Sequence, residues 1–318
     1  MPQDSPQLRA NLQACFPSLV VEEVAAESGQ RVVYFGHFDD ALIPEDIPKP
    51  EQDSPSFLHG WGDWGRVVIK VVAGASPEAL TRLQAETDIL SEVRPRNFPS
   101  LRFCNLFVDN PLTDEPLPEK LYVSIEEFIV SKTLAHAMAD YEGNSAAVFD
   151  LCLGIANALL PLWTHAKRFV HRDIKPENIL IKPNGDVVVI DLGIVRETGG
   201  SGVTREGWGN SPLTLDFAAP EQIANDKDAI SFKSDFFALG VLIYLLLARQ
   251  HPFRTRDGMD DYELANAVEH SEPRSLLELG AAPEHVSGFV ESLMRKAPYM
   301  RPRTPDLLVQ RLQELREK

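Results

Sequence analysis

The chain has 318 residues, of which 44% are hydrophobic, so it is long enough to bury a sizeable core. A formal net charge of −16 argues against nucleic acid or an anionic membrane as a primary partner. The longest apolar run, residues 241–248, is too short to cross a bilayer, and the first residues lack a signal pattern. Cys15, Cys104 and Cys152 share no close spacing, which predicts neither a disulfide framework nor a zinc site. We therefore expect a cytoplasmic protein.

The first part of the chain contains a turn and an unusually long connection. Residues 1–18 are a short extension that contains Pro and Gln, and residues 20–36 carry Ser28 and Gly29 in a turn between two apolar stretches. Residues 38–60 are rich in Pro and acidic side chains and cannot bury enough apolar surface to fold alone. We interpret them as a disordered insertion; the alternative is a docking segment for a partner.

A buried strand and a helix follow the insertion. Residues 66–72, RVVIKVV, are β-branched and apolar around a single Lys70, as in a buried strand. The stretch 76–93 begins with Ser-Pro and has apolar residues at near-helical spacing, with Glu86 on the predicted helix. A polar loop at 109–120 then joins two further strands.

The segment GWGDWG at 60–65 fits the glycine pattern of a phosphate-binding loop. It stands only five residues before Lys70, which leaves no room for the second strand and turn that such a loop needs at about 3.3 Å per residue. We interpret it as a tight turn that enters the strand. Trp61 and Trp64 then pack in the core or bind a partner.

The most informative segment is HRDIKPENIL at 171–180, which is followed by VVVIDLG at 187–193. It combines Asp173, Lys175 and Asn178 with an acid, Asp191, at the end of an apolar run. Carboxylate and amide oxygens are ligands that Mg²⁺ accepts, and a Lys nearby can neutralise phosphate charge. The combination is typical of phosphoryl transfer from Mg-ATP to a hydroxyl.

These motifs resemble those of eukaryotic-like Ser/Thr protein kinases, a family that includes bacterial members. The resemblance runs from about residue 19 to the end. It implies an α+β, bilobal fold with a β-rich N-lobe at about 19–127, a hinge at about 127–131 and a mainly helical C-lobe at about 132–318.

The resemblance implies a role for each site residue. Asp173 would accept or orient the proton of the substrate hydroxyl, with Lys175 and Thr214 beside it. Asn178 and Asp191 would hold Mg²⁺ against ATP. The residues implied in ATP binding are Ser28, Gly29, Val33, Lys70, Glu86, Glu127, Asn178 and Asp191, with Glu86 expected to pair with Lys70.

Two departures from the family pattern concern the nucleotide site. Of the glycine loop only Gly29 lies within the turn, so backbone amides would approach phosphate less freely. In LYVSIEEFIV at 121–130, Glu127 matches the hinge acid, which leaves Glu126 at the usually apolar gatekeeper position. A shift of one residue in strand register would instead turn Glu126 to solvent, and the sequence does not choose between the two.

Three further segments of the C-terminal half carry family signatures. Ala219-Pro220-Glu221 resembles the end of an activation segment, and the buried Glu221 is expected to pair with Arg301. Asp235, followed by Phe237 where the family usually has Trp, would anchor the backbone of the catalytic loop. Arg172 would capture a phosphate on the long segment after Asp191, where Ser201 and Thr204 are the candidates for modification.

The function implied is ATP-dependent phosphorylation of Ser or Thr in a protein substrate, with autophosphorylation expected. One alternative is a pseudokinase scaffold, which the poor glycine loop favours; Lys70, Glu86, Asp173, Asn178 and Asp191 together count against it. The other is a small-molecule kinase, against which Lys175 and the Ala-Pro-Glu segment count.

Overall fold

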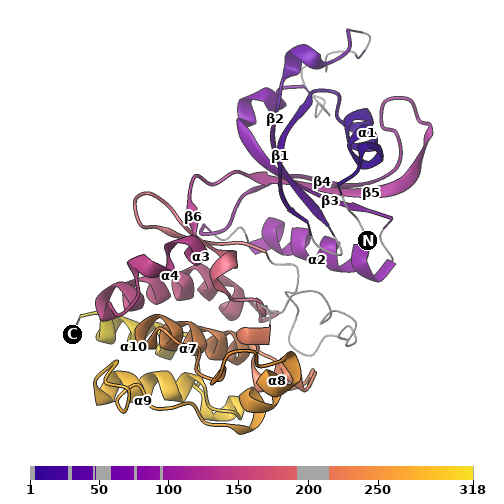
Figure 1. The fold of residues 1–318 in the computed structure, drawn as a ribbon. Helices are drawn as coiled ribbons and strands as arrows, with labels where there is room; N and C mark the ends of the chain where they lie inside the picture. The colour runs from indigo at the N-terminus through magenta and orange to yellow at the C-terminus, as the bar shows by residue number, and fades with distance from the viewer. Residues whose placement is uncertain are drawn as a thin grey trace. The chain divides into compact units, whose positions relative to one another are not determined.

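The computed structural model describes residues 4–27, 31–45, 47, 59–74, 77–93, 96–191 and 215–317. The chain divides into two compact units. The first comprises Met1–Glu92 and Pro99–Ile129, and the second comprises Val93–Phe98 and Val130–Lys318 (Figure 1). The expected β-rich N-terminal and helical C-terminal parts are both present.

An antiparallel five-stranded sheet forms the centre of the first unit. Its strands are β1 (Leu19–Glu27), β2 (Val32–Phe38), β3 (Arg66–Ala73), β4 (Leu101–Asp109) and β5 (Pro116–Glu127), in the order β1-β2-β3-β5-β4. The two apolar stretches on either side of Ser28-Gly29 form β1 and β2, which pair up to Glu27 and Val32. Val67, Ile69 and Val71 of β3 are fully buried on one face, so by the two-residue period of a strand Lys70 lies on the other.

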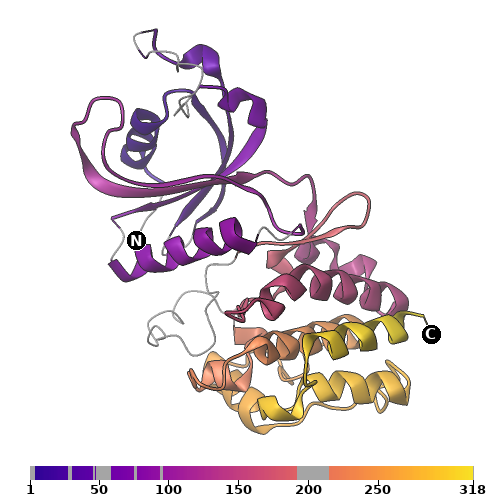
Figure 2. The same ribbon diagram turned by 180° about the vertical axis from the view of Figure 1, so that it is seen from behind.

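Two helices cover opposite faces of this sheet, α1 (Pro6–Cys15) and α2 (Pro77–Val93) (Figures 1 and 2). Helix α1 begins after Ser5, whose hydroxyl accepts a hydrogen bond from the amide of Leu8. Leu8, Leu12 and Cys15 lie in the same core cluster as the inner residues of the sheet. The stretch 1–18 thus contributes an apolar helix face to the core of the first unit.

The turn before β3 places two tryptophan side chains against the core. It contains the 3₁₀ segment η2 (Trp61–Trp64) between Gly60 and Gly65, both of which have positive φ. The Asp40 carboxylate accepts hydrogen bonds from the amides of Gly60 at 2.7 Å and Gly62 at 3.1 Å. The ring of Trp61 stacks on Trp64 at 4.4 Å and lies among Phe16, Phe38 and Phe103. The prediction of a tight turn that enters the strand is confirmed, with the tryptophans packing in the core.

The predicted insertion 38–60 is described only in part. A single 3₁₀ turn, η1 (Asp40–Leu42), follows β2, and Ile43 and Ile47 pack against the core cluster. Residues 46 and 48–58 lie outside the described residues. The predicted loop 109–120 does join two strands, but only residues 110–115 form the connection, since β5 begins at Pro116.

The second unit is mainly helical. Its short three-stranded sheet has the order β6-β7-β8. Its elements are β6 (Lys132–Thr133), α3 (Leu134–Ala137), η3 (Met138–Asp140), α4 (Ser145–Thr164), η4 (Pro176–Asn178), β7 (Ile179–Ile181), β8 (Val187–Val189), α6 (Pro220–Ile223), α7 (Phe232–Ala248), α8 (Asp261–His270), α9 (Glu284–Leu293), η6 (Pro298–Met300) and α10 (Pro305–Arg316).

Helices α4 and α7 form the core of the second unit. Helix α4 is long and apolar enough to cross a membrane by length and composition alone. It packs against α7, α10 and β8, however, and more than half of its most apolar window is buried, which is typical of a core helix. In α7, a Cβ at Gly240 would lie 2.8 Å from atoms of Leu293 and Met294, so the glycine permits close packing against α9.

Candidate active site

A buried carboxylate fixes the backbone of the segment that carries Asp173. Asp235, near the start of α7, is 1% exposed and accepts hydrogen bonds from the amides of His171 at 2.9 Å and Arg172 at 2.8 Å. It also accepts the indole N–H of Trp163 at 2.8 Å. Burial raises the pKa of Asp235, and the three donors partly offset that effect. The expectation that Asp235 anchors this loop is confirmed, and Arg172 takes up a left-handed conformation at φ 71° there.

The anchored loop brings three predicted residues together. The Asp173 carboxylate Oδ2 lies 2.8 Å from Nζ of Lys175 and accepts a 2.9 Å hydrogen bond from Nδ2 of Asn178. Asn178 Nδ2 also donates to the Asp173 backbone carbonyl at 2.9 Å. The side chains of Lys175 and Asp173 are only 14% and 10% exposed, so their charges attract more strongly than they would in water. An amide and an ammonium group thus orient one carboxylate.

A backbone hydrogen bond connects Asn178 of this cluster to Ile190, the residue directly before Asp191. The amide of Ile190 donates to the carbonyl of Asn178 at 2.9 Å, and the His171 ring nitrogen Nε2 lies 3.2 Å from the carbonyl of Ile190. Asp191 itself has φ 70°, a conformation that non-glycine residues rarely adopt and that occurs often at functional sites.

Asn178 and Asp191 carry oxygen donors of the kind that magnesium accepts. Within the described ranges, no group of three or more His, Cys, Asp or Glu side chains could hold a metal ion. Asn178 uses its amide nitrogen toward Asp173, so its amide oxygen is the atom that could ligate a cation, together with the Asp191 carboxylate. Magnesium usually takes one or two protein ligands and completes its octahedron with phosphate and water.

In the first unit, Lys70 has a partner that the sequence did not identify. Nζ of Lys70 lies 2.7 Å from Oε1 of Glu126, and the two side chains are 11% and 5% exposed. Of the two registers left open, the one that turns Glu126 inward is therefore correct. Glu127 instead accepts hydrogen bonds from the amide and hydroxyl of Ser100 at 3.2 and 2.9 Å. Val33 lies directly opposite Lys70 in the β2–β3 ladder.

Several predicted residues lie outside the described part of the chain. These are Ser28 and Gly29 of the turn and Thr214, Ser201 and Thr204 of the segment after Asp191. Glu86 lies on α2, but its side chain is not among those described. The expected pairing of Glu86 with Lys70 stays a prediction.

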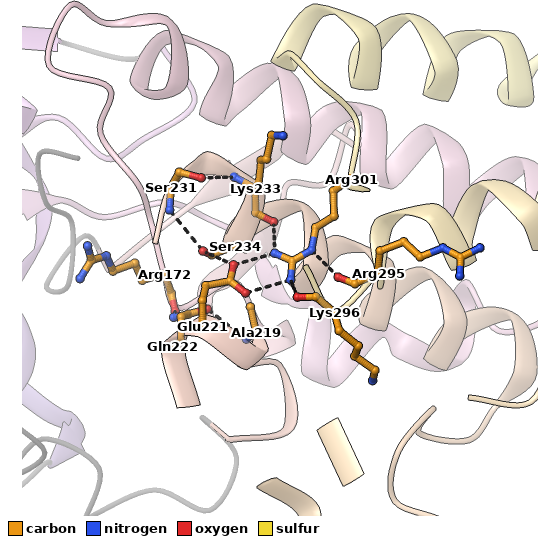
Figure 3. A network of polar contacts seen from close by, with 10 residues as sticks. All are labelled: Arg172, Ala219, Glu221, Gln222, Ser231, Lys233, Ser234, Arg295, Lys296 and Arg301. Atoms are coloured by element: carbon orange, nitrogen blue, oxygen red, sulfur yellow. Dashed lines mark hydrogen bonds and ion pairs between the residues drawn. The ribbon is translucent and has the colours of Figure 1, made fainter. Parts of the chain in front are cut away.

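The predicted pair of Glu221 and Arg301 is confirmed. Arg301 Nη1 and Nη2 lie 2.6 and 2.8 Å from the two carboxylate oxygens of Glu221, and both side chains are buried (Figure 3). Ser234 Oγ donates to Glu221 at 2.7 Å. Phe237, at the position where the family usually has Trp, stacks on Phe253 with the Arg301 guanidinium over its ring at 5.0 Å.

A contact that sequence reasoning missed joins the Ala-Pro-Glu segment to the catalytic loop. Gln222 Nε2 donates to the carbonyl of Arg172 at 2.9 Å, while Gln222 Oε1 accepts from the amide of Ala219 at 3.1 Å. The segment just before it is held by Arg254, whose Nη2 lies 2.8 Å from Asp216, and by His251, whose Nε2 lies 2.7 Å from the Asp216 carbonyl. Burial lowers the pKa of His251, so the ring is neutral near pH 7.

Comparison with known proteins agrees with this geometry. The family model of the protein kinase domain matches residues 65–312. This chain belongs to the protein kinase family. The match includes the loop around Asp173, the Glu221–Arg301 pair and Lys70.

Several curated relatives of this kinase are named serine/threonine-protein kinases. One is Probable serine/threonine-protein kinase SCO3848 of Streptomyces coelicolor, 32% identical over 154 residues, which are 47% of this chain and 22% of that protein. Serine/threonine-protein kinase C of Synechocystis is 36% identical over 139 residues, 42% of this chain and 25% of that protein. Human serine/threonine-protein kinase 16 is 30% identical over 170 residues, 50% and 53% of the two chains. The matched stretches thus span between about a fifth and about half of these relatives.

Proposed function

We propose that the chain is a Ser/Thr protein kinase that transfers the γ-phosphoryl group of Mg-ATP to a hydroxyl of a protein substrate. The observation that carries this proposal is the cluster of Asp173, Lys175 and Asn178, held in place by Asp235. A bare scaffold needs no carboxylate oriented by both an ammonium and an amide. The names of the curated relatives favour Ser and Thr as acceptors.

The residues of the cluster have complementary roles in this reaction. Asp173 orients the substrate hydroxyl and accepts its proton as the hydroxyl oxygen bonds to the γ-phosphorus. The bond from that phosphorus to the bridging oxygen breaks, and ADP leaves. Lys175, 2.8 Å from Asp173, neutralises negative charge that develops on the transferred group.

Other residues hold the nucleotide. Bound Mg-ATP supplies the phosphoryl group and a divalent charge, and Asn178 and Asp191 provide oxygen ligands for the ion. Lys70 contacts the α- and β-phosphates, and Ser28, Gly29, Val33, Glu86 and Glu127 complete the proposed nucleotide site.

The direct test is to incubate the purified chain with γ-labelled Mg-ATP and a generic basic protein. We expect label on Ser or Thr of the protein, and at least about a hundredfold less label when Asp173→Asn replaces the wild type. Binding of Mg-ATP without transfer to any acceptor would overturn the proposal in favour of a pseudokinase. Label found only on small metabolites would overturn it in favour of a small-molecule kinase.

We further infer a cytoplasmic protein, and we propose residues 38–60 as a candidate docking segment for a physiological partner. Deletion of residues 48–57 tests the docking role, because these residues lie between Ile47, which packs on the core, and the turn at Gly60. We expect basal phosphorylation of a generic peptide to persist and phosphorylation of the physiological partner to fall; equal rates on that partner would contradict the docking role.

A further inference from the structure

The geometry points to Glu126 as a positioning residue for Lys70. We propose that the Glu126 carboxylate holds the Lys70 ammonium where it meets the phosphates of ATP, so that loss of its charge weakens nucleotide binding. This inference rests on the proposed function, which assigns Lys70 to the α- and β-phosphates. It concerns one contact within the first unit, the 2.7 Å approach of Lys70 Nζ to Glu126 Oε1.

The strand register brings these two residues together. In the β3–β5 ladder, Lys70 lies opposite Ser124 and Glu126 lies opposite Val68. Lys70 and Glu126 are therefore diagonal neighbours on the same face of the sheet, a separation that long side chains can span. Ser124 and Tyr122 continue that face along β5 and are 5% and 6% exposed, so the ion pair lies in a largely buried row.

Burial makes Glu126 depend on a cationic partner. Glu126 is 4% exposed, and an uncompensated carboxylate at that depth would be strongly destabilising. A charge-assisted contact to Lys70 offsets this cost and at the same time restrains a side chain that has four rotatable bonds. A restrained ammonium loses less conformational entropy when it contacts a phosphate.

Of the two acids at the end of β5, Glu126 is the one that contacts Lys70. Glu127 is the last residue of β5. Its carboxylate accepts hydrogen bonds from the amide and hydroxyl of Ser100, which connect it to the start of β4. Glu127 thus stabilises the end of the sheet. Glu126 is directed to the other face, at the lysine that the proposed function uses.

The test measures Mg-ATP binding and turnover of the full chain with Glu126→Gln, which keeps the size of the side chain and removes its charge. We expect the Kd for Mg-ATP to rise about tenfold, as for loss of a charge-assisted contact, with kcat changed less than about threefold. In a Lys70→Met background the same change should have no further effect on Kd, because the residue it positions is gone. Glu115→Gln, an exposed acid before β5, is the matched control and should bind like the wild type.

A Kd for Glu126→Gln equal to or below that of the wild type would overturn the proposal, as would equal losses with and without Lys70. If Glu126→Gln does not fold by its thermal melt, Glu126→Asp keeps the charge on a shorter side chain and should raise Kd by a few-fold. An unchanged Kd for a folded Glu126→Asp would then overturn the proposal.

A wild type that binds no Mg-ATP would instead overturn the proposed function itself. A wild type that binds while only Lys70→Met loses affinity would overturn the role of Glu126 alone.

Discussion

Arg301 and Glu221 form a bidentate ion pair in the core of the second unit, 80 residues apart in the chain. The guanidinium uses each of its nitrogens fully, because it also donates to the carbonyls of Lys233, Arg295 and Lys296 at 2.8, 2.8 and 3.0 Å (Figure 3). A single side chain thus joins the Ala-Pro-Glu segment to the start of α7 and to the chain before η6.

Arg301→Lys should therefore be strongly destabilising even though it keeps the charge. An ammonium has three donors and no planar fork, so it leaves buried carbonyls or one oxygen of Glu221 without a partner. We expect a loss of about 2–4 kcal/mol in the free energy of unfolding, measured by denaturant titration. Arg303→Lys, at an exposed position two residues on, is the control and should change stability by less than about 0.5 kcal/mol.

The Glu221–Arg301 pair and the role of Asp235 could be predicted from sequence because each residue belongs to a motif whose position fixes its partner. The turn at Gly60–Gly65 could be predicted because five residues are too few for a strand and a loop. Helix α1 could also have been predicted, because Leu8, Leu12 and Cys15 follow helical spacing after the capping Ser5.

Other contacts could not be predicted because they depend on how distant segments pack. Trp163 needs an acceptor for its indole N–H when buried, but nothing in α4 indicates that this acceptor is Asp235, 72 residues away. The partner of Lys70 depends on which face of β5 carries Glu126, and a shift of one residue reverses that face. The link from Gln222 to the carbonyl of Arg172 depends on a backbone atom, which carries no sequence signal.

Changing Asp173 and Asp191 to Asn, one at a time, should affect turnover and Mg-ATP binding differently. Asp173→Asn removes the group that accepts the hydroxyl proton but leaves the proposed phosphate contacts, so kcat should fall about 10²–10⁴-fold while the Kd for Mg-ATP stays within about threefold. Asp191→Asn removes a magnesium ligand and should raise that Kd as well. Steady-state kinetics and calorimetry measure both. Turnover above about a tenth of wild type for Asp173→Asn would show that this acid has another role.

Lys296 predicts a pH dependence of stability in the alkaline range. Burial lowers its pKa from 10.5 to about 8, while Nζ donates to the carbonyl of Val268 and lies 4.1 Å from the Phe253 ring centroid. Between these two pKa values the unfolded chain binds more protons at this site than the folded chain, so its contribution to stability rises with pH. We expect the wild type to gain about 1 kcal/mol relative to Lys296→Met between pH 7 and about 10. Parallel chemical unfolding of both proteins measures the difference, and a constant gap across this range would rule out the shift.

Autophosphorylation on Ser201 or Thr204 is expected to activate the enzyme. Arg172 directly precedes Asp173, and a phosphate that it captures would form charge-assisted hydrogen bonds beside the catalytic loop. Mass spectrometry after incubation with ATP identifies the site, and rates are then compared before and after phosphatase treatment. The double variant Ser201→Ala and Thr204→Ala should keep the unphosphorylated rate. Equal rates in the two forms of the wild type would exclude a switch at these residues.

Two segments that contain glycine, the turn at Ser28-Gly29 and the turn at Gly60–Gly65, are the alternative places where the phosphates of ATP could bind. If the turn between β1 and β2 covers them, Gly29→Val adds a branched side chain where backbone must approach an anion, and the KM for ATP should rise about tenfold or more. Gly62→Ala should leave that KM unchanged, because a Cβ there would meet only Phe38 O at 3.4 Å and the Asp40 carboxylate at 3.5 Å, both at ordinary contact distance. Gly60→Ala should lower stability by about 1 kcal/mol through its positive φ of 80°, again without a change in KM. ATP kinetics that depended on Gly60 and Gly62 but not on Gly29 would require a phosphate site at η2, away from the β1–β2 turn.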